Sequence, residues 1–101
     1  MEELECRFDS RASFYGKAKV EELETTGEHG KTILKNLYSY GTLVAKILYA
    51  YIDNTTTITY LYMGKYSQTT TRHQKEFFKQ EGLSEKEIKD LFKNGKLVKG
   101  W

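Results

Sequence analysis

The spacing of the apolar residues changes once along the chain, close to Tyr66, and this change constrains the fold more than any other feature. Before it, apolar and polar residues alternate as in strands; after it, apolar residues recur every three or four positions as in helices. Turns depend on Gly, Asn and Asp, because the chain contains no proline. The sequence therefore predicts an α+β domain, with an antiparallel sheet of about four strands followed by two short C-terminal helices.

Four segments before this point have strand-like patterns. Alternation and β-branched or aromatic content predict strands over residues 12–20, 32–40, 42–52 and 55–66, with a short piece before them at 5–8. Residues 25–30 contain two glycines and no apolar side chain, which indicates a loop, and Asp53-Asn54 indicates a tight turn. The segment 42–52 is apolar on both faces except at Lys46, so we expect it to be the central strand.

Two helix patterns follow. Several possible N-caps precede a first helix over residues 72–80, which should end at Gly82. Ser84 and Glu87 then form the S-x-x-E pattern of a capping box, and the next apolar residues lie on one helical stripe: Ile88, Leu91 and Phe92. We expect a single domain over residues 1–101, with the sheet at about 5–66 and the helical pair at about 70–94.

Composition limits the class of protein. A chain of 101 residues with 39% apolar content can build one modest core. The single cysteine, Cys6, and the acidic first residues, which do not resemble a signal peptide, favour a reducing, cytoplasmic location. No run approaches the roughly 20 apolar residues that cross a bilayer, so we expect no membrane association. The net charge is +2, but residues 1–30 carry eight acidic and four basic side chains.

No catalytic, phosphate-binding or metal-binding motif is present in the sequence. A zinc site or a cysteine nucleophile would require Cys6, His29 or His73 to converge from distant segments. We therefore expect no cofactor, no metal and no enzymatic activity. For His73 the favoured interpretation is a partly buried structural histidine bonded to a strand carbonyl. The alternative is a polar cluster at a helix N-terminus, residues 70–73, that binds an anion.

Eight tyrosines lie in predicted strands, together with several lysines. Within the last strand Tyr60 and Tyr62 alternate with Leu61 and Met63, so the two tyrosines share one face. Such a face could pack under the helices, form a protein interface or stack unpaired bases, in that order of preference.

Three stretches carry a resemblance to a group of known proteins. FDSRASFYGKA at residues 8–18, LYSYGTLVA at 37–45 and YSQTTTRHQKEF at 66–77 are similar to small proteins of unknown function from phages and mobile elements of Gram-positive bacteria. The similarity spans about residues 8–80. It implies no assigned activity, but proteins of this kind often bind and block a host factor, and anti-CRISPR inhibitors are one such class.

We therefore predict a small phage or mobile-element protein that inhibits a host defence protein, such as a CRISPR nuclease, in the host bacterial cytoplasm. The basic nucleic-acid channel of such a nuclease would attract acidic groups. The predicted partner-binding residues are Glu21, Glu22, Glu24, Glu28, Tyr60, Tyr62 and Arg72. The alternative is a nucleic-acid-binding protein that uses the tyrosine face and a basic helix, with Arg72, Lys75 and Lys79. The sequence leaves the oligomeric state open.

Overall fold

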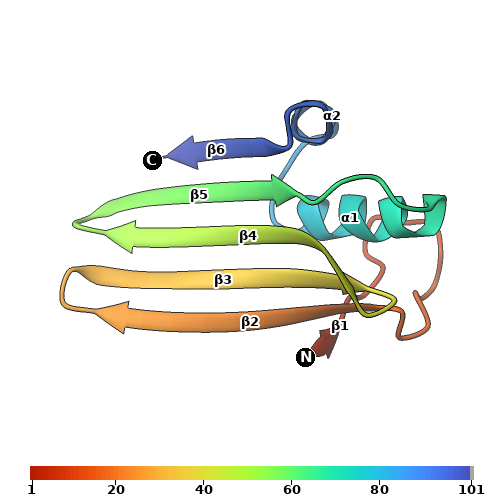
Figure 1. Cartoon of the computed structure of the whole chain (residues 1–101), viewed down its shortest axis with the longest axis horizontal. Helices are drawn as coiled ribbons and strands as arrows, with labels where there is room; N and C mark the ends of the chain where they lie inside the picture. The colour runs from red at the N-terminus through yellow and green to blue at the C-terminus, as the bar shows by residue number, and fades with distance from the viewer. Residues whose placement is uncertain (101) are drawn as a thin grey trace.

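The fold is one antiparallel sheet of six strands with two helices packed against part of one face (Figure 1). The computed structural model describes residues 1–100. The strands neighbour one another in the order in which they occur in the sequence. The elements are β1 (Glu2–Glu3), β2 (Ala18–Gly27), β3 (Gly30–Ser39), β4 (Thr42–Ile52), β5 (Thr55–Tyr62), α1 (Gln68–Gln80), α2 (Glu85–Asn94) and β6 (Lys96–Gly100).

The predicted α+β class, antiparallel sheet and C-terminal helices are confirmed, but the expected number of about four strands is wrong. The two additional strands, β1 and β6, are short and lie at the two edges of the sheet. The short N-terminal strand lies at residues 2–3 and not at 5–8. β6 begins directly after Gly95, whose left-handed backbone (φ 81°) ends α2 and turns the chain back along β5.

The first long strand begins at Ala18 and not at residue 12. Tyr15 and Gly16 have φ values of 52° and 74°, and the Lys17 N–H donates to the Phe14 carbonyl at 3.0 Å, so these residues form a turn. The strand then continues to Gly27, through residues that were expected to be a loop. Only two residues, Glu28 and His29, separate β2 from β3.

Two-residue turns fix the other two hairpins. Tyr40 and Gly41 join β3 to β4 with φ values of 51° and 81°, and the predicted turn at Asp53 and Asn54 joins β4 to β5 with φ values of 49° and 66°. Positive φ at both central residues gives a turn whose twist matches that of the strands. The predicted strand at residues 42–52 is confirmed with the same bounds, and it pairs with a neighbour on each side.

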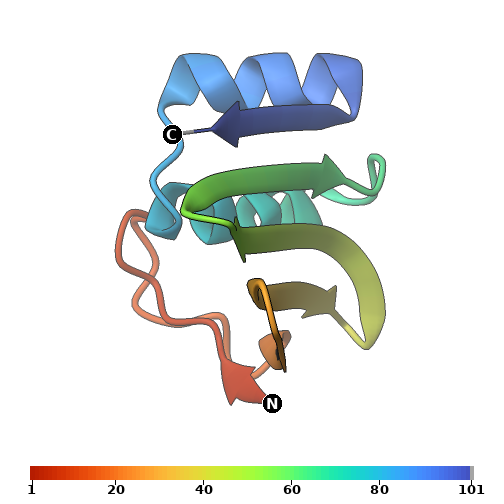
Figure 2. The same ribbon diagram turned by 90° about the vertical axis from the view of Figure 1, so that its left-hand side faces the viewer.

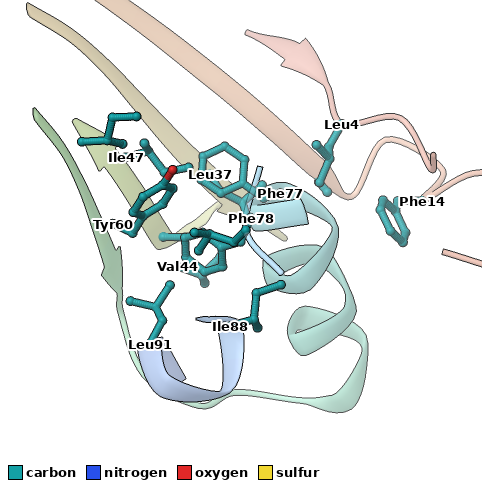
Figure 3. Packing of buried hydrophobic residues seen from close by; sticks show 14 residues of the cluster. Leu4, Phe14, Leu37, Val44, Ile47, Tyr60, Phe77, Phe78, Ile88 and Leu91 are labelled. Atoms are coloured by element: carbon teal, nitrogen blue, oxygen red, sulfur yellow. The ribbon is translucent and has the colours of Figure 1, made fainter. Parts of the chain in front are cut away.

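The helices cover one face of the sheet, here called the covered face. α1 lies against β3 and β4, and α2 lies against β5 and β6. Apolar side chains of both helices meet those of the strands in a single core, most of which is visible in Figure 3: Leu37, Val44, Ile47, Tyr60, Phe77, Phe78, Ile88 and Leu91. The opposite face, here called the uncovered face, has no helix on it within the described residues.

The helical layer reaches along only part of the strands. β2, β3, β4 and β5 run beyond it to the turns at residues 28–29 and 53–54, as Figure 1 shows, and these turns point toward the viewer in Figure 2. Burial falls in the same direction: Ala18 is buried, whereas every residue from 23 to 27 is exposed. The outer half of the sheet is therefore held by strand pairing, with solvent on both faces.

The capping box at α2 gives a first test of the fold. The Ser84 hydroxyl accepts from the Glu87 N–H at 3.2 Å, and the Glu87 carboxylate accepts from the Ser84 N–H at 3.0 Å. Replacing Ser84→Ala removes one of these bonds, so the free energy of unfolding in urea should fall by about 1 kcal/mol. Ser10→Ala, at an exposed position, is the control and should leave the midpoint unchanged. Equal midpoints for the two variants would contradict this role of the cap.

Candidate protein-binding surfaces

The predicted acidic cluster is divided between the two faces of the sheet, because side chains alternate along β2. Glu21 lies on the uncovered face, where its carboxylate accepts from Asn36 Nδ2 at 3.1 Å. Glu22 and Glu24 lie on the covered face, in register with Lys35 and Ile33 of β3, and the exposed Glu24 carboxylate lies 3.4 Å from the Lys31 amine. Glu28 lies in the exposed β2–β3 turn. The structure therefore keeps Glu22 and Glu24 together and separates Glu21 from them.

The outer edge of β2 is open over most of its length. β1 pairs only with Lys19 and Val20, and the Leu4 N–H donates to the Ala18 carbonyl at 2.9 Å. Within the described chain, no strand pairs with the outer side of β2 between Glu21 and Gly27. Unpaired backbone groups along such an edge can pair with another extended segment.

An acidic groove lies beside this edge. We define it by the charged residues that line a cavity of about 220 Å³ between β1, β2 and α1: Glu2, Glu3, Glu5, Arg7, Glu22, Lys35 and Glu81. Five of these residues are carboxylates and two are cations. Lys35 forms an ion pair with Glu81, and Arg7 lies 3.7 Å from Glu5. No ion pair within residues 1–100 involves Glu2, Glu3 or Glu22, so the groove carries uncompensated negative charge.

A buried carboxylate holds one wall of the groove in place. Glu76 of α1 is 2% exposed, and one of its oxygens accepts from the backbone N–H groups of Phe8 and Asp9 at 2.9 and 2.8 Å. Its other oxygen accepts from Gln80 Nε2, which also donates to the Glu5 carbonyl. These bonds attach residues 5–9 to α1. Glu76 was not predicted from the sequence, since a glutamate within a helix gives no signal of burial.

The two predicted tyrosines lie beneath the helices. Tyr60 is 1% exposed, its hydroxyl donates to the Glu81 carbonyl at 3.2 Å, and burial raises its pKa to about 12. The ring of Tyr62 stacks on Phe92 of α2, with 4.2 Å between ring centres. Tyr60 therefore offers no free ring face, and one ring face of the half-buried Tyr62 is covered by Phe92. They occupy the packing position that the sequence analysis preferred.

Arg72 lies on α1, away from both tyrosines. Its guanidinium is 3.6 Å from the Asp9 carboxylate, so its charge is partly neutralised within the chain. Lys79 forms an ion pair with Glu85. The structure therefore does not bring the predicted basic helix and the predicted tyrosine face together on one surface.

His73 is buried, as the preferred interpretation predicted, but its partner is a hydroxyl group and not a carbonyl. Its Nδ1 lies 2.8 Å from the Ser39 hydroxyl, which also lies 2.9 Å from the Thr70 hydroxyl. The Phe14 ring packs edge-on against the imidazole, with 4.5 Å between ring centres. The cluster joins the end of β3, the start of α1 and the N-terminal loop. His73 is 1% exposed, so it meets no solvent-borne anion in this structure.

The uncovered face carries two rows of side chains that the sequence analysis did not assemble. The cross-strand register aligns one mostly apolar row from β2 to β6: Leu23, Leu34, Leu48, Thr59 and Val98. The neighbouring row is more polar: Glu21, Asn36, Lys46, Leu61 and Lys96. Leu23 and Val98 are 50% and 51% exposed. The strand patterns contained these residues, but only the pairing register places them side by side.

The described residues contain no group of three or more histidine, cysteine or carboxylate side chains that could hold a metal ion. Neither helix of the structure is long and apolar enough to cross a membrane.

The chain belongs to a protein family of unknown function, DUF8033, which it matches over residues 2–94. The matched region begins at β1 and ends at the last residue of α2. No curated protein and no solved structure shows a significant match to the chain.

The Glu76 anchor can be tested by Glu76→Gln. A glutamine could accept from the Phe8 and Asp9 N–H groups only by turning its own NH₂ toward the Gln80 NH₂, which would place two donors together. We expect a loss of about 1–3 kcal/mol in the free energy of unfolding, measured in urea. Glu5→Gln is the control, because Glu5 is exposed on the same loop. Full stability of Glu76→Gln would show that the anchor contributes little.

The buried histidine predicts a pH dependence. Burial lowers the pKa of His73 from 6.5, so the unfolded chain takes up this proton more readily than the folded chain. The free energy of unfolding should therefore fall as pH decreases from about 7 to about 5. His73→Gln should flatten this part of the profile, whereas His29→Gln, at a side chain that is 76% exposed, should preserve it. A profile with the same slope in both variants would exclude His73 as the cause.

Proposed function

We propose that this protein is a binding module that docks a basic, extended segment of a partner protein along the outer edge of β2. The observation that carries the proposal is the open strand edge between Glu21 and Gly27 with the acidic groove beside it. An extended segment that adds to a sheet edge gains backbone hydrogen bonds, while neighbouring side chains and charges select its sequence.

The backbone of β2 supports this mode of binding. Residues of an antiparallel strand point their N–H and C=O groups alternately toward each neighbour. The Ala18 carbonyl accepts from the Leu4 N–H on the outer side, so alternation directs the backbone groups of Glu22, Glu24 and Thr26 outward as well. At roughly 3.3 Å per residue, the open edge is roughly 23 Å long.

The acidic side chains determine which segment can bind. If two copies of β2 paired antiparallel about Leu23, Glu22 of one would lie opposite Glu24 of the other, and like charges opposite each other destabilise a strand pair. A segment with lysine or arginine at these positions would be attracted instead. The charges thus disfavour edge-to-edge self-association and favour a basic partner.

Inhibition of a host defence protein is one form that such binding could take. A CRISPR nuclease holds nucleic acid in a positively charged channel, so an acidic strand edge is a suitable blocking group. The phage or mobile-element origin, the cytoplasmic location and the identity of the target stay predictions from the sequence. The alternative, nucleic-acid binding through Tyr60, Tyr62 and Arg72, has less support, because two of these side chains pack under α2 and α1 and the third is paired with Asp9.

His73 and Cys6, the two side chains considered for nucleophilic catalysis, are poorly placed for it. Ser39 and His73 are bonded to each other in the core. Burial, together with the carboxylates of Asp9 and Glu76, raises the pKa of the Cys6 thiol, so little of it is thiolate at neutral pH.

The proposal predicts that charge reversal at two positions removes binding. Tagged wild-type protein and the variant Glu22→Lys/Glu24→Lys should be used for affinity capture from a bacterial lysate, with a high-salt wash to release nucleic acid. We expect the wild type to retain a protein partner and the variant to lose at least about nine-tenths of it. The milder Glu22→Gln/Glu24→Gln removes the charges without adding new repulsion and should weaken capture to an intermediate degree.

Asp90→Lys is the matched control, since Asp90 is an exposed acid on α2, away from β2. It should capture as much partner as the wild type. Equal capture by the Glu22→Lys/Glu24→Lys variant would exclude the β2 edge as the contact. Recovery of nucleic acid alone, released by salt, would favour the nucleic-acid alternative.

A further inference from the structure

We infer that two copies of this chain associate through their uncovered faces, related by a two-fold axis that runs along β3 between the two sheets. This surface is separate from the β2 edge, so the inference goes beyond the proposed function and does not depend on it. It rests on three features of the uncovered face: its exposed apolar row, the placement of its unpaired charges and its size.

The apolar row supplies the contact. Leu23, Leu34 and Leu48 lie side by side on β2, β3 and β4, where Leu23 is 50% and Leu48 is 37% exposed. An exposed apolar patch that spans neighbouring strands marks a surface for association. Two sheets that pack face to face interdigitate such side chains at a separation of roughly 10 Å.

The axis along β3 follows from the charges in the neighbouring row. Glu21 on β2 and Lys46 on β4 lie in this row on either side of Asn36 of β3. The Glu21 carboxylate is held over the face by Asn36 Nδ2 at 3.1 Å and by the Tyr38 hydroxyl at 3.5 Å. Among residues 1–100, neither Glu21 nor Lys46 takes part in an ion pair.

A two-fold axis along β3 places each β2 over β4 of the second copy. Glu21 then lies opposite Lys46 of the second copy, and this ion pair occurs twice. The same operation places Leu23 opposite Leu48 of the second copy and Leu34 opposite its own equivalent. An axis along β4 would instead place the two Lys46 side chains against each other, which charge repulsion disfavours. Of the two axes, only the one along β3 makes the acidic, basic and apolar side chains of one copy complementary to those of the other.

The size of the overlap fits a weak dimer. About an axis along β3, the strands β2, β3 and β4 of the two copies cover one another, and three strands spaced at roughly 4.8 Å, each with ten residues at roughly 3.3 Å, outline roughly 500 Å² per copy before the relief of the side chains is added. Each partner in a standard specific interface contributes about 800 Å², and weak, transient interfaces bury less. Partial burial of Leu34 and Lys46 in the single chain also lowers the cost of ordering them on association.

Sedimentation velocity provides the test. The wild type should pass from monomer to dimer between about 1 µM and about 500 µM, with dimer at the upper concentration. Glu21→Lys places lysine opposite Lys46, and Lys46→Glu places glutamate opposite Glu21. Each single variant should raise the dissociation constant at least about tenfold, because the repulsion occurs twice per dimer. The double variant Glu21→Lys/Lys46→Glu restores opposite charges and should recover most of the wild-type affinity.

Thermal unfolding of each variant controls for misfolding, and Glu22→Lys/Glu24→Lys should dimerise as the wild type does because both residues lie on the covered face. A wild type that is monomeric at every concentration would overturn the inference. So would a dimer whose affinity falls in the single variants without recovery in the double variant, since this would place the contact elsewhere. If Glu22→Lys/Glu24→Lys loses partner capture but still dimerises, the two contacts are independent. The failure of one proposal can then be told apart from the failure of the other.

Discussion

One residue, Glu81, connects the helical layer to three neighbouring strands. Its carboxylate pairs with Lys35 of β3 and accepts from the Tyr49 hydroxyl of β4 at 2.9 Å, and its carbonyl accepts from the Tyr60 hydroxyl of β5. These bonds form at the C-terminal end of α1, where the last carbonyl groups of a helix lack partners within the helix. The desolvated Tyr49, hydrogen-bonded to this carboxylate, has a raised pKa and stays a neutral donor. The position of α1 on the sheet is thereby fixed, and the core forms around it.

The consequence is a sheet that is covered over only part of its area. Beyond Glu81 the strands continue without a second layer, and side-chain contacts along and between neighbouring strands replace core packing. Tyr49 and Tyr51 stack with 6.4 Å between ring centres, and the Lys31 amine lies over the Tyr51 ring at 5.7 Å. Such contacts are each weak, so this half of the sheet should open more readily than the half under the helices. Both candidate surfaces lie on or next to this less protected half, where the chain leaves side chains and backbone groups free for a partner.

The fold was largely predictable because periodicity is a local property. The change of period at Tyr66, the capping box at Ser84 and the Asp53-Asn54 turn all depend on neighbouring residues, and the structure confirms them. The missed features depend on contacts that the sequence does not show. Tyr15 adopts a positive φ that its side chain does not favour. β6 is five residues long and follows a helix directly, so its pattern was too short to recognise.

The candidate surfaces were less predictable for the same reason. The acidic cluster of the sequence became two groups, because a period of two sends Glu21 to one face and Glu22 and Glu24 to the other. The tyrosines were identified as one face, but which face the helices would cover depended on the register of strands far apart in the sequence. The apolar row from Leu23 to Val98 draws one residue from each of five strands, and only pairing brings these residues together.

The alternation along β2 also allows both proposed contacts to coexist. Its odd-numbered side chains point toward a second copy, whereas the backbone of its even-numbered residues points outward along the sheet edge. In a dimer whose axis follows β3, the two β2 strands lie on opposite sides of that axis, so their open edges face away from each other. The assembly would then offer two acidic edges to a partner. A partner with two basic segments at a matching distance would bind both edges. Because its second contact would be intramolecular, its overall affinity could exceed the affinity for one edge by roughly 10²-fold or more. The proposed self-association on one face and the proposed partner binding at the edge would thus be two uses of a single strand, separated by the geometry of its backbone.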